Sequence, residues 1–90
     1  MTAYRVHFVT DLMRLDDDGI DDLVWRLAEV GGIPSAPDGA LEVTGTTDAP
    51  DARSAVDTVG RVLEHALKAM NRPCHVVGVQ AGAVRLYEPS

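Results

Sequence analysis

Residues 52–70 read ARSAVDTVGRVLEHALKAM and carry the most regular hydrophobic pattern in the chain. Their apolar positions are spaced by three and four residues: Ala52, Ala55, Val56, Val59, Leu63, Ala66, Leu67 and Met70. This spacing predicts an amphipathic helix, because residues three or four apart lie on one face of an α-helix. Thr47 or Asp48 is the expected N-cap, and Asn71 with Pro73 is expected to end the helix.

The opposite side of this helix carries charges of both signs. Asp57 stands four residues before Arg61, and Glu64 stands four residues before Lys68. Side chains four residues apart are neighbours on a helix surface, so the spacing predicts two ion pairs along one helix.

A strand and a second helix are predicted before this region. Residues 4–9 alternate apolar and polar side chains, which is typical of a strand with one buried face. Asp16 is the expected N-cap of a helix that begins near Asp17, and Gly31 with Gly32 is expected to end it. The apolar stripe of this helix comprises Ile20, Leu23, Val24, Leu27 and Val30.

Three further strands are expected. Residues 33–36 form a short segment in which Pro34 favours a position at the sheet edge. Residues 40–47 alternate as a strand does, and residues 75–87 read as one long strand with a bulge at Gly82, or as a strand and a short return.

The order strand, helix, strand, strand, helix, strand predicts an α+β protein of the ferredoxin-like βαββαβ plan. We expect residues 1–90 to form a single domain with an antiparallel sheet and two helices packed on one face. The other face of the sheet is then open.

The composition of the chain argues against two classes of partner, nucleic acid and membranes. The net charge of −6 argues against nucleic acid, because few cations are available to neutralise phosphates. No apolar run reaches the length needed to cross a membrane, so no membrane partner is expected. The single cysteine, Cys74, cannot form an internal disulfide, which agrees with a cytoplasmic location.

Four short stretches together support a resemblance: Tyr4–Val6, Leu15–Asp18, Leu41–Val43 and Val77–Val79. Their pattern resembles that of small uncharacterised ferredoxin-like proteins of actinobacteria and their phages. The resemblance implies the fold and a range of hosts. It transfers no catalytic residue to this chain.

No motif demands a reaction, so no catalytic residue, cofactor or enzymatic activity is assigned. The acidic run Asp16–Asp18, with Asp21 and Asp22, lacks the alternating ligand spacing of a calcium loop. Cys74 and His75 are adjacent, and neighbouring residues of a strand point to opposite faces. No metal site is therefore predicted.

The first functional hypothesis is a non-enzymatic protein that binds another protein through the outer side of residues 17–30. Successive residues of a helix are 100° apart around its axis, and this places Trp25 away from the apolar stripe. Aromatic rings dominate binding hot spots. The alternative is that the ring folds over the helix and covers the edge of the core. The predicted surface comprises Asp21, Asp22, Trp25, Arg26 and Glu29.

The open sheet face is a second candidate surface, and pairing through it predicts a homodimer. Its expected residues are Arg5, His7, Val9, Glu42, Thr44, Val76, Gly78 and Gln80.

Two other functions are compatible with the sequence. One is a dimeric small-ligand-binding domain of the sensor type, or a minor enzyme, with Arg5 and His7 in a pocket between subunits. The other is an acidic mimic of nucleic acid, which the net charge alone suggests.

Overall fold

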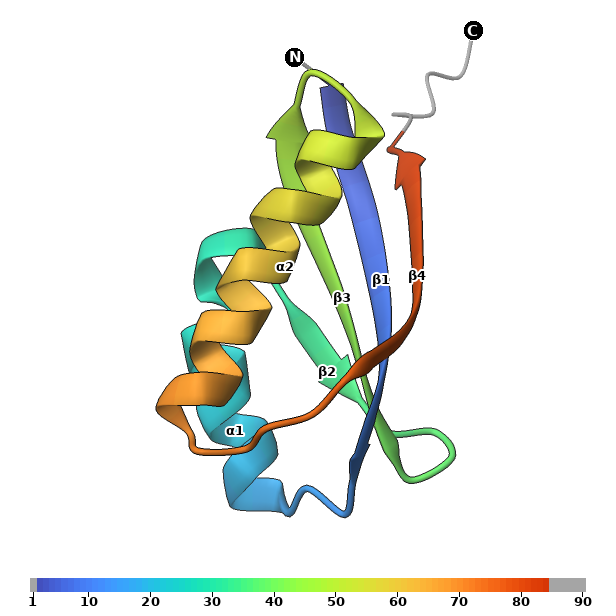
Figure 1. Cartoon of the computed structure of the whole chain (residues 1–90). Coiled ribbons are helices and arrows are strands. Elements are labelled where there is room, and N and C mark those ends of the chain that lie inside the picture. Colours follow the sequence, from blue (N-terminus) through green and yellow to red (C-terminus); the bar gives the residue numbers. More distant parts are fainter. Residues whose placement is uncertain (1, 85–90) are drawn as a thin grey trace, which may run out of the picture.

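The computed structural model describes residues 2–84 of the chain. Its helices and strands are, in order, β1 (Thr2–Met13), α1 (Asp17–Arg26), β2 (Ile33–Ser35), β3 (Ala40–Ala49), α2 (Ala52–Ala69) and β4 (Val76–Ala83) (Figure 1). A 3₁₀ turn, Ala28–Val30, follows α1. The element order and the α+β class agree with the prediction from sequence.

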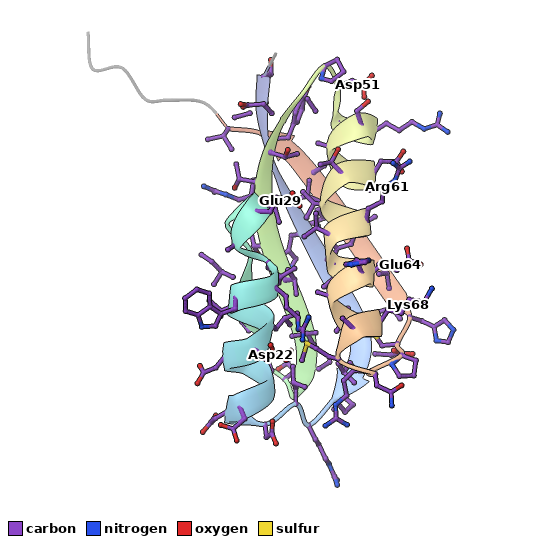
Figure 2. The ribbon with its side chains drawn as sticks, turned by 90° about the vertical axis from the view of Figure 1, so that its left-hand side faces the viewer. Asp22, Glu29, Asp51, Arg61, Glu64 and Lys68 are labelled. Atoms are coloured by element: carbon purple, nitrogen blue, oxygen red, sulfur yellow. The ribbon has the colours of Figure 1, made fainter. Side chains whose placement is uncertain are left out.

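The four strands form one open antiparallel sheet in the order β2-β3-β1-β4. The two longest strands, β1 and β3, therefore occupy the centre, and β2 and β4 are the edges. Both helices lie side by side on one face of the sheet (Figure 2). No described helix covers the other face.

The core lies between this helical layer and the inner face of the sheet. Val6 and Phe8 of β1 face inward opposite Gly45 and Val43 of β3, because alternate residues of a strand share a face. The helices and the cap residue that follows α1 contribute the buried side chains Leu23, Leu27, Ala55, Val59, Leu63, Ala66 and Leu67. The α2 stripe predicted from sequence is the one that packs on the sheet.

Gly45 sets the distance between α2 and β3. A Cβ atom at this position would lie 2.8 Å from Val59 Cγ1 and 3.3 Å from Val30 Cγ2. The missing side chain admits both valines against the strand backbone, so the helix and the sheet approach closely at this point.

The Thr10 side chain supplies hydrogen bonds where the backbone ladder between β1 and β3 is irregular. The register between β1 and β3 shifts between Val9 and Met13. Next to this shift, the buried Thr10 hydroxyl donates to the Leu41 carbonyl at 2.8 Å and accepts the Leu12 N–H at 3.2 Å. A side chain thus takes over hydrogen bonds in an irregular part of the ladder.

The predicted N-cap of α2 is wrong. Thr47 and Asp48 pair with β1, so β3 continues to Ala49. Asp51 caps the helix instead, and its carboxylate accepts the Ser54 N–H at 2.8 Å. This backbone hydrogen bond lowers the pKa of Asp51.

The irregularity of β4 also differs from the prediction. Val9 pairs with Gly78 and Thr10 with Val76, so Val77 is the extra residue of a bulge. Gly82 pairs regularly with Arg5, so the bulge expected there is absent. The predicted strand end at residues 85–87 lies outside the described residues.

Two glycine-to-alanine substitutions are expected to change stability in opposite directions. Gly45→Ala should lower the free energy of unfolding by about 1–3 kcal/mol, because the added methyl group overlaps Val59. Gly60→Ala in α2 should raise it by about 0.5–1 kcal/mol, because alanine favours the helix and its Cβ would lie an ordinary 3.4 Å from Phe8 Cζ. Urea unfolding of both variants measures the difference, and equal effects would contradict the packing described for Gly45.

Thr10→Val should lower the free energy of unfolding by about 1–3 kcal/mol. The substitution keeps the shape but removes the donor to Leu41 and the acceptor for Leu12. Thr46→Val, on an exposed part of β3, is the control and should change stability by less than about 0.5 kcal/mol. Similar losses for the two variants would show that the Thr10 hydroxyl is not structural.

Candidate functional site

The outer side of α1 presents an exposed indole ring. Trp25 is 82% exposed, so it does not fold over the helix to cover the core. The other predicted members of this surface, Asp21, Asp22, Arg26 and Glu29, are also exposed. The structure therefore brings the five residues together on one solvent-facing surface, which we call the α1 surface.

This surface stands on a well-anchored helix. Leu23 and Leu27 are fully buried on the opposite side of α1, and they fix the helix against the sheet layer. At the N-terminus, the Asp16 carboxylate accepts the Gly19 N–H at 2.8 Å. The indole is thus carried by a rigid element rather than by a loop.

Val24 is a second exposed apolar residue of α1. The sequence predicts it in the buried stripe, yet it is 45% exposed. Val24 lies 100° around the helix from Leu23, so the buried stripe is narrower than predicted and its edge reaches solvent beside Trp25. The stripe pattern alone could not show which of its members the sheet would leave uncovered.

The surroundings of Trp25 are mainly acidic. Asp17, Asp18, Asp21 and Asp22 occupy the first two turns of α1, and all are exposed. The Arg26 guanidinium donates to the Asp22 carboxylate at 3.1 Å, so the cation of this surface is already paired. Figure 2 shows Asp22 on α1 and Glu29 on the 3₁₀ turn that follows it.

The open sheet face holds seven of the residues predicted for it, in three cross-strand rows. Thr44, His7 and Gln80 form one row, and Glu42, Val9 and Gly78 form the next. Arg5 lies in a third row, between Thr46 and Gly82.

Val76, which the sequence predicts on this face, does not lie on it. The bulge at Val77 shifts the register, and Val76 pairs with the inward-facing Thr10. It therefore lies on the helical side of the sheet.

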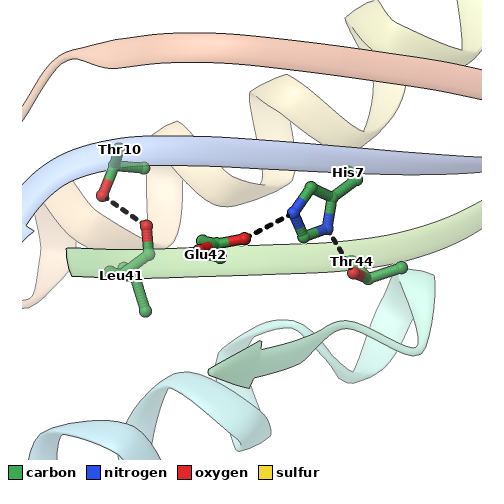
Figure 3. Close-up of polar contacts among 5 residues, drawn as sticks. All are labelled: His7, Thr10, Leu41, Glu42 and Thr44. Carbon is green, nitrogen blue, oxygen red and sulfur yellow. Dashed lines mark hydrogen bonds and ion pairs between the residues drawn. The ribbon is translucent and has the colours of Figure 1, made fainter. Parts of the chain in front are cut away.

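His7 is fixed by two hydrogen-bonding partners on β3 (Figure 3). Its Nε2 lies 2.7 Å from Glu42 Oε1, and its Nδ1 lies 2.7 Å from Thr44 Oγ1. An ionised carboxylate only accepts, so Nε2–H donates to Glu42, and Nδ1 of the neutral ring accepts the Thr44 hydroxyl proton. The Glu42 side chain is only 19% exposed although no described helix covers it.

The same three residue types serve as nucleophile, base and orienting acid in acyl-transfer enzymes. Such chemistry also needs free donors for a developing oxyanion. Around His7 and Thr44, however, the backbone groups of β1 and β3 are engaged, because each strand has a neighbour on both sides. The arrangement therefore supports a structural role more strongly than a catalytic one.

Arg5 and His7 also border a shallow hollow of about 690 Å³ on the open face. Its remaining lining comes from β4 and the residue after it, Gln80 to Val84. The hollow is open to solvent along the sheet edge, so within residues 2–84 it is only one wall of the pocket that the ligand-binding alternative requires.

A second groove, which the sequence did not indicate, runs between α2 and β4 on the helical side. Its volume is about 700 Å³, and its apolar lining is Phe8, Val56, Gly60, Leu63, Leu67, Pro73, Cys74 and Val76. Burial raises the pKa of the Cys74 thiol, which keeps it protonated. The charged rim is Asp57, Arg61, Glu64, Lys68 and Arg72.

The loop between α2 and β4 is tied to β1 at the end of this groove. One oxygen of the Asp11 carboxylate accepts the His75 backbone N–H at 2.7 Å. The other carboxylate oxygen of Asp11 lies 3.3 Å from His75 Nδ1. The backbone hydrogen bond lowers the pKa of Asp11.

Among residues 2–84, no three histidine, cysteine or acidic side chains gather closely enough to hold a metal ion. Over the same residues, neither helix has the length and apolar character of a membrane span.

No protein-family model matches the chain, and no curated protein matches it in sequence.

His7 and Glu42 should be energetically coupled. A double-mutant cycle with His7→Ala and Glu42→Ala should give a coupling energy of about 1 kcal/mol in unfolding experiments at neutral pH. The matched cycle of His7 with Gln80, its neighbour on β4 to which no hydrogen bond is formed, should give a value near zero. Equal coupling in the two cycles would contradict the network.

Proposed function

We propose that this protein acts without catalysis, by binding another protein through the α1 surface, with Trp25 as the anchor. The observation that carries the proposal is the 82% exposure of Trp25 on a helix whose other side is anchored by the fully buried Leu23. An indole offers roughly 150–250 Å² of surface for burial and one N–H donor, which is why tryptophan is enriched in binding hot spots.

Rigidity of the helix supports this role. Because α1 is capped at Asp16 and anchored by Leu23 and Leu27, little conformational entropy is lost when a partner orders the indole. Val24 extends the apolar contact area on the same helix. The partner that fits is a protein with an apolar pocket for the ring and a basic rim for Asp17, Asp18, Asp21 and Asp22.

We further propose that the fold is ferredoxin-like. The support is its connectivity: β1 and β2 are separated by β3, and β3 and β4 are separated by β1, as in a split βαβ repeat. The actinobacterial and phage proteins of this fold are the proposed relatives. The cytoplasm is the proposed compartment, where a lone thiol such as Cys74 stays reduced.

Trp25→Ala should weaken binding of the partner by about 2 kcal/mol or more and change the free energy of unfolding by less than about 0.5 kcal/mol. Partners are captured from a native lysate on the immobilised full chain, identified, purified and titrated. Trp25 is the only tryptophan, so its emission should shift to the blue when a partner without tryptophan covers it.

Met13→Ala is the matched control, because Met13 is also an exposed apolar residue but lies outside α1. It should retain every partner that the unmodified chain captures. Equal affinity of a purified partner for Trp25→Ala and for the unmodified chain would contradict the proposal.

A further inference from the structure

We propose that β4 is a dimerisation edge, along which two copies of this chain pair antiparallel and join their sheets into one. The two sheet edges differ in a way that points to this strand. β2 is three residues long and contains Pro34, which limits pairing with another strand. β4 spans Val76–Ala83, reads VVGVQAGA and contains no charge and no proline.

The outer side of β4 has backbone groups available for such pairing. The Val84 N–H donates to the Ala3 carbonyl, so in an antiparallel ladder the backbones of Gln80 and Gly82 also face β1. Those of Val79 and Ala81 then face away from it. Within residues 2–84 no strand lies on that side.

The side chains of β4 are left unusually exposed. Val76, Val77 and Val79 are 50%, 64% and 48% exposed, although Val79 pairs with the buried Phe8. The groove between α2 and β4 adjoins them on the helical side. A second β4 would cover the strand edge and bring a second α2 toward the groove.

The rim of this groove carries a charge pattern that fits a second copy of the same surface. Asp57, Arg61, Glu64 and Lys68 all border the groove, and their signs alternate. The sequence predicts ion pairs between Asp57 and Arg61 and between Glu64 and Lys68. Neither is among the ion pairs formed within residues 2–84. Figure 2 shows Arg61, Glu64 and Lys68 along the side of α2 that faces away from α1.

A two-fold axis makes this stripe complementary to itself. If the axis passes midway between Arg61 and Glu64, then Asp57 lies opposite Lys68 of the other copy, and Arg61 lies opposite Glu64 of the other copy. The two-fold axis repeats each of these two pairs, so the dimer has four such contacts, and all of them are attractive. A parallel arrangement would place each charge opposite its own copy, so only the antiparallel dimer is favoured.

One axis can serve the helices and the strands together. Gly60 lies over Phe8, and Phe8 pairs with Val79, so Gly60 and Val79 lie at the same level. The midpoint of the charge stripe is within one helical turn of Gly60. The axis therefore passes near Val79, where the outward-facing backbone groups of the two strands meet. A peptide from another protein could occupy the edge, but it would not supply the matching stripe.

This dimer leaves the α1 surface free, because α1 contacts the opposite part of the sheet, at β2. It also differs from pairing through the open face.

The experiment uses the full chain and measures mass by light scattering after size exclusion, and affinity by sedimentation equilibrium. We expect a concentration-dependent dimer, which Trp25→Ala leaves intact.

Arg61→Glu alone and Glu64→Arg alone should each weaken the dimer roughly tenfold or more, because attractive contacts become repulsive. An equimolar mixture of the two variants should recover the dimer. In the mixed dimer, the introduced glutamate of one variant faces the introduced arginine of the other, and the unchanged Glu64 faces the unchanged Arg61. This recovery occurs between chains and cannot arise from an altered contact within one chain.

Arg53→Glu is the matched control for the charge reversal. It makes the same change of charge on α2, but Arg53 does not line the groove. This variant should dimerise as the unmodified chain does.

Ala81→Pro tests the strand edge directly, because it removes an N–H that points away from β1. Circular dichroism should show a folded chain, and light scattering should show a monomer. The proposal is overturned by a monomeric unmodified chain, by a dimer that Arg61→Glu or Ala81→Pro leaves unchanged, or by a mixture that stays monomeric.

Discussion

The close approach of α2 to β3 at Gly45 is the constraint on which the rest of the fold depends. Val59 and Val30 occupy the space that a side chain at position 45 would fill, so the helix, the 3₁₀ turn and the sheet meet there. α2 consequently lies over the central strands, with Val59 above β3 and Gly60 above Phe8 of β1. α2 also contacts the outer strand β4, but it leaves the valines of that strand exposed.

This placement gives the two halves of the molecule different surfaces. On the β2 side, α1 covers the sheet and turns an indole outward, on a helix held by buried leucines. On the β4 side, an uncharged strand and an apolar groove remain uncovered, with a rim of alternating charge. The first surface suits a partner of different sequence, and the second suits its own copy. Both can be occupied together, because they lie at opposite edges of the sheet.

The open face of the sheet is polar but ordered. His7 joins Glu42 and Thr44 across β1 and β3, and this pairing explains how a carboxylate becomes mostly covered without a described helix above it. Hydrogen bonds between side chains replace apolar packing as the stabilising contact of this face. The network engages both ring nitrogens of His7, the Thr44 hydroxyl and one carboxylate oxygen of Glu42, which favours a structural over a chemical role.

The sequence by itself determined the order of elements, the apolar stripe of α2, the N-cap of α1 and the face on which Arg5, His7 and Thr44 lie, because these follow from local periodicity and capping. The tertiary structure alone decided the exposure of Trp25 and Val24, the cap at Asp51, the bulge at Val77 and the groove beside β4. Each of these depends on where one element ends against another, and a one-residue bulge is enough to move Val76 to the other side of the sheet. Periodicity within a segment carries no information about that contact.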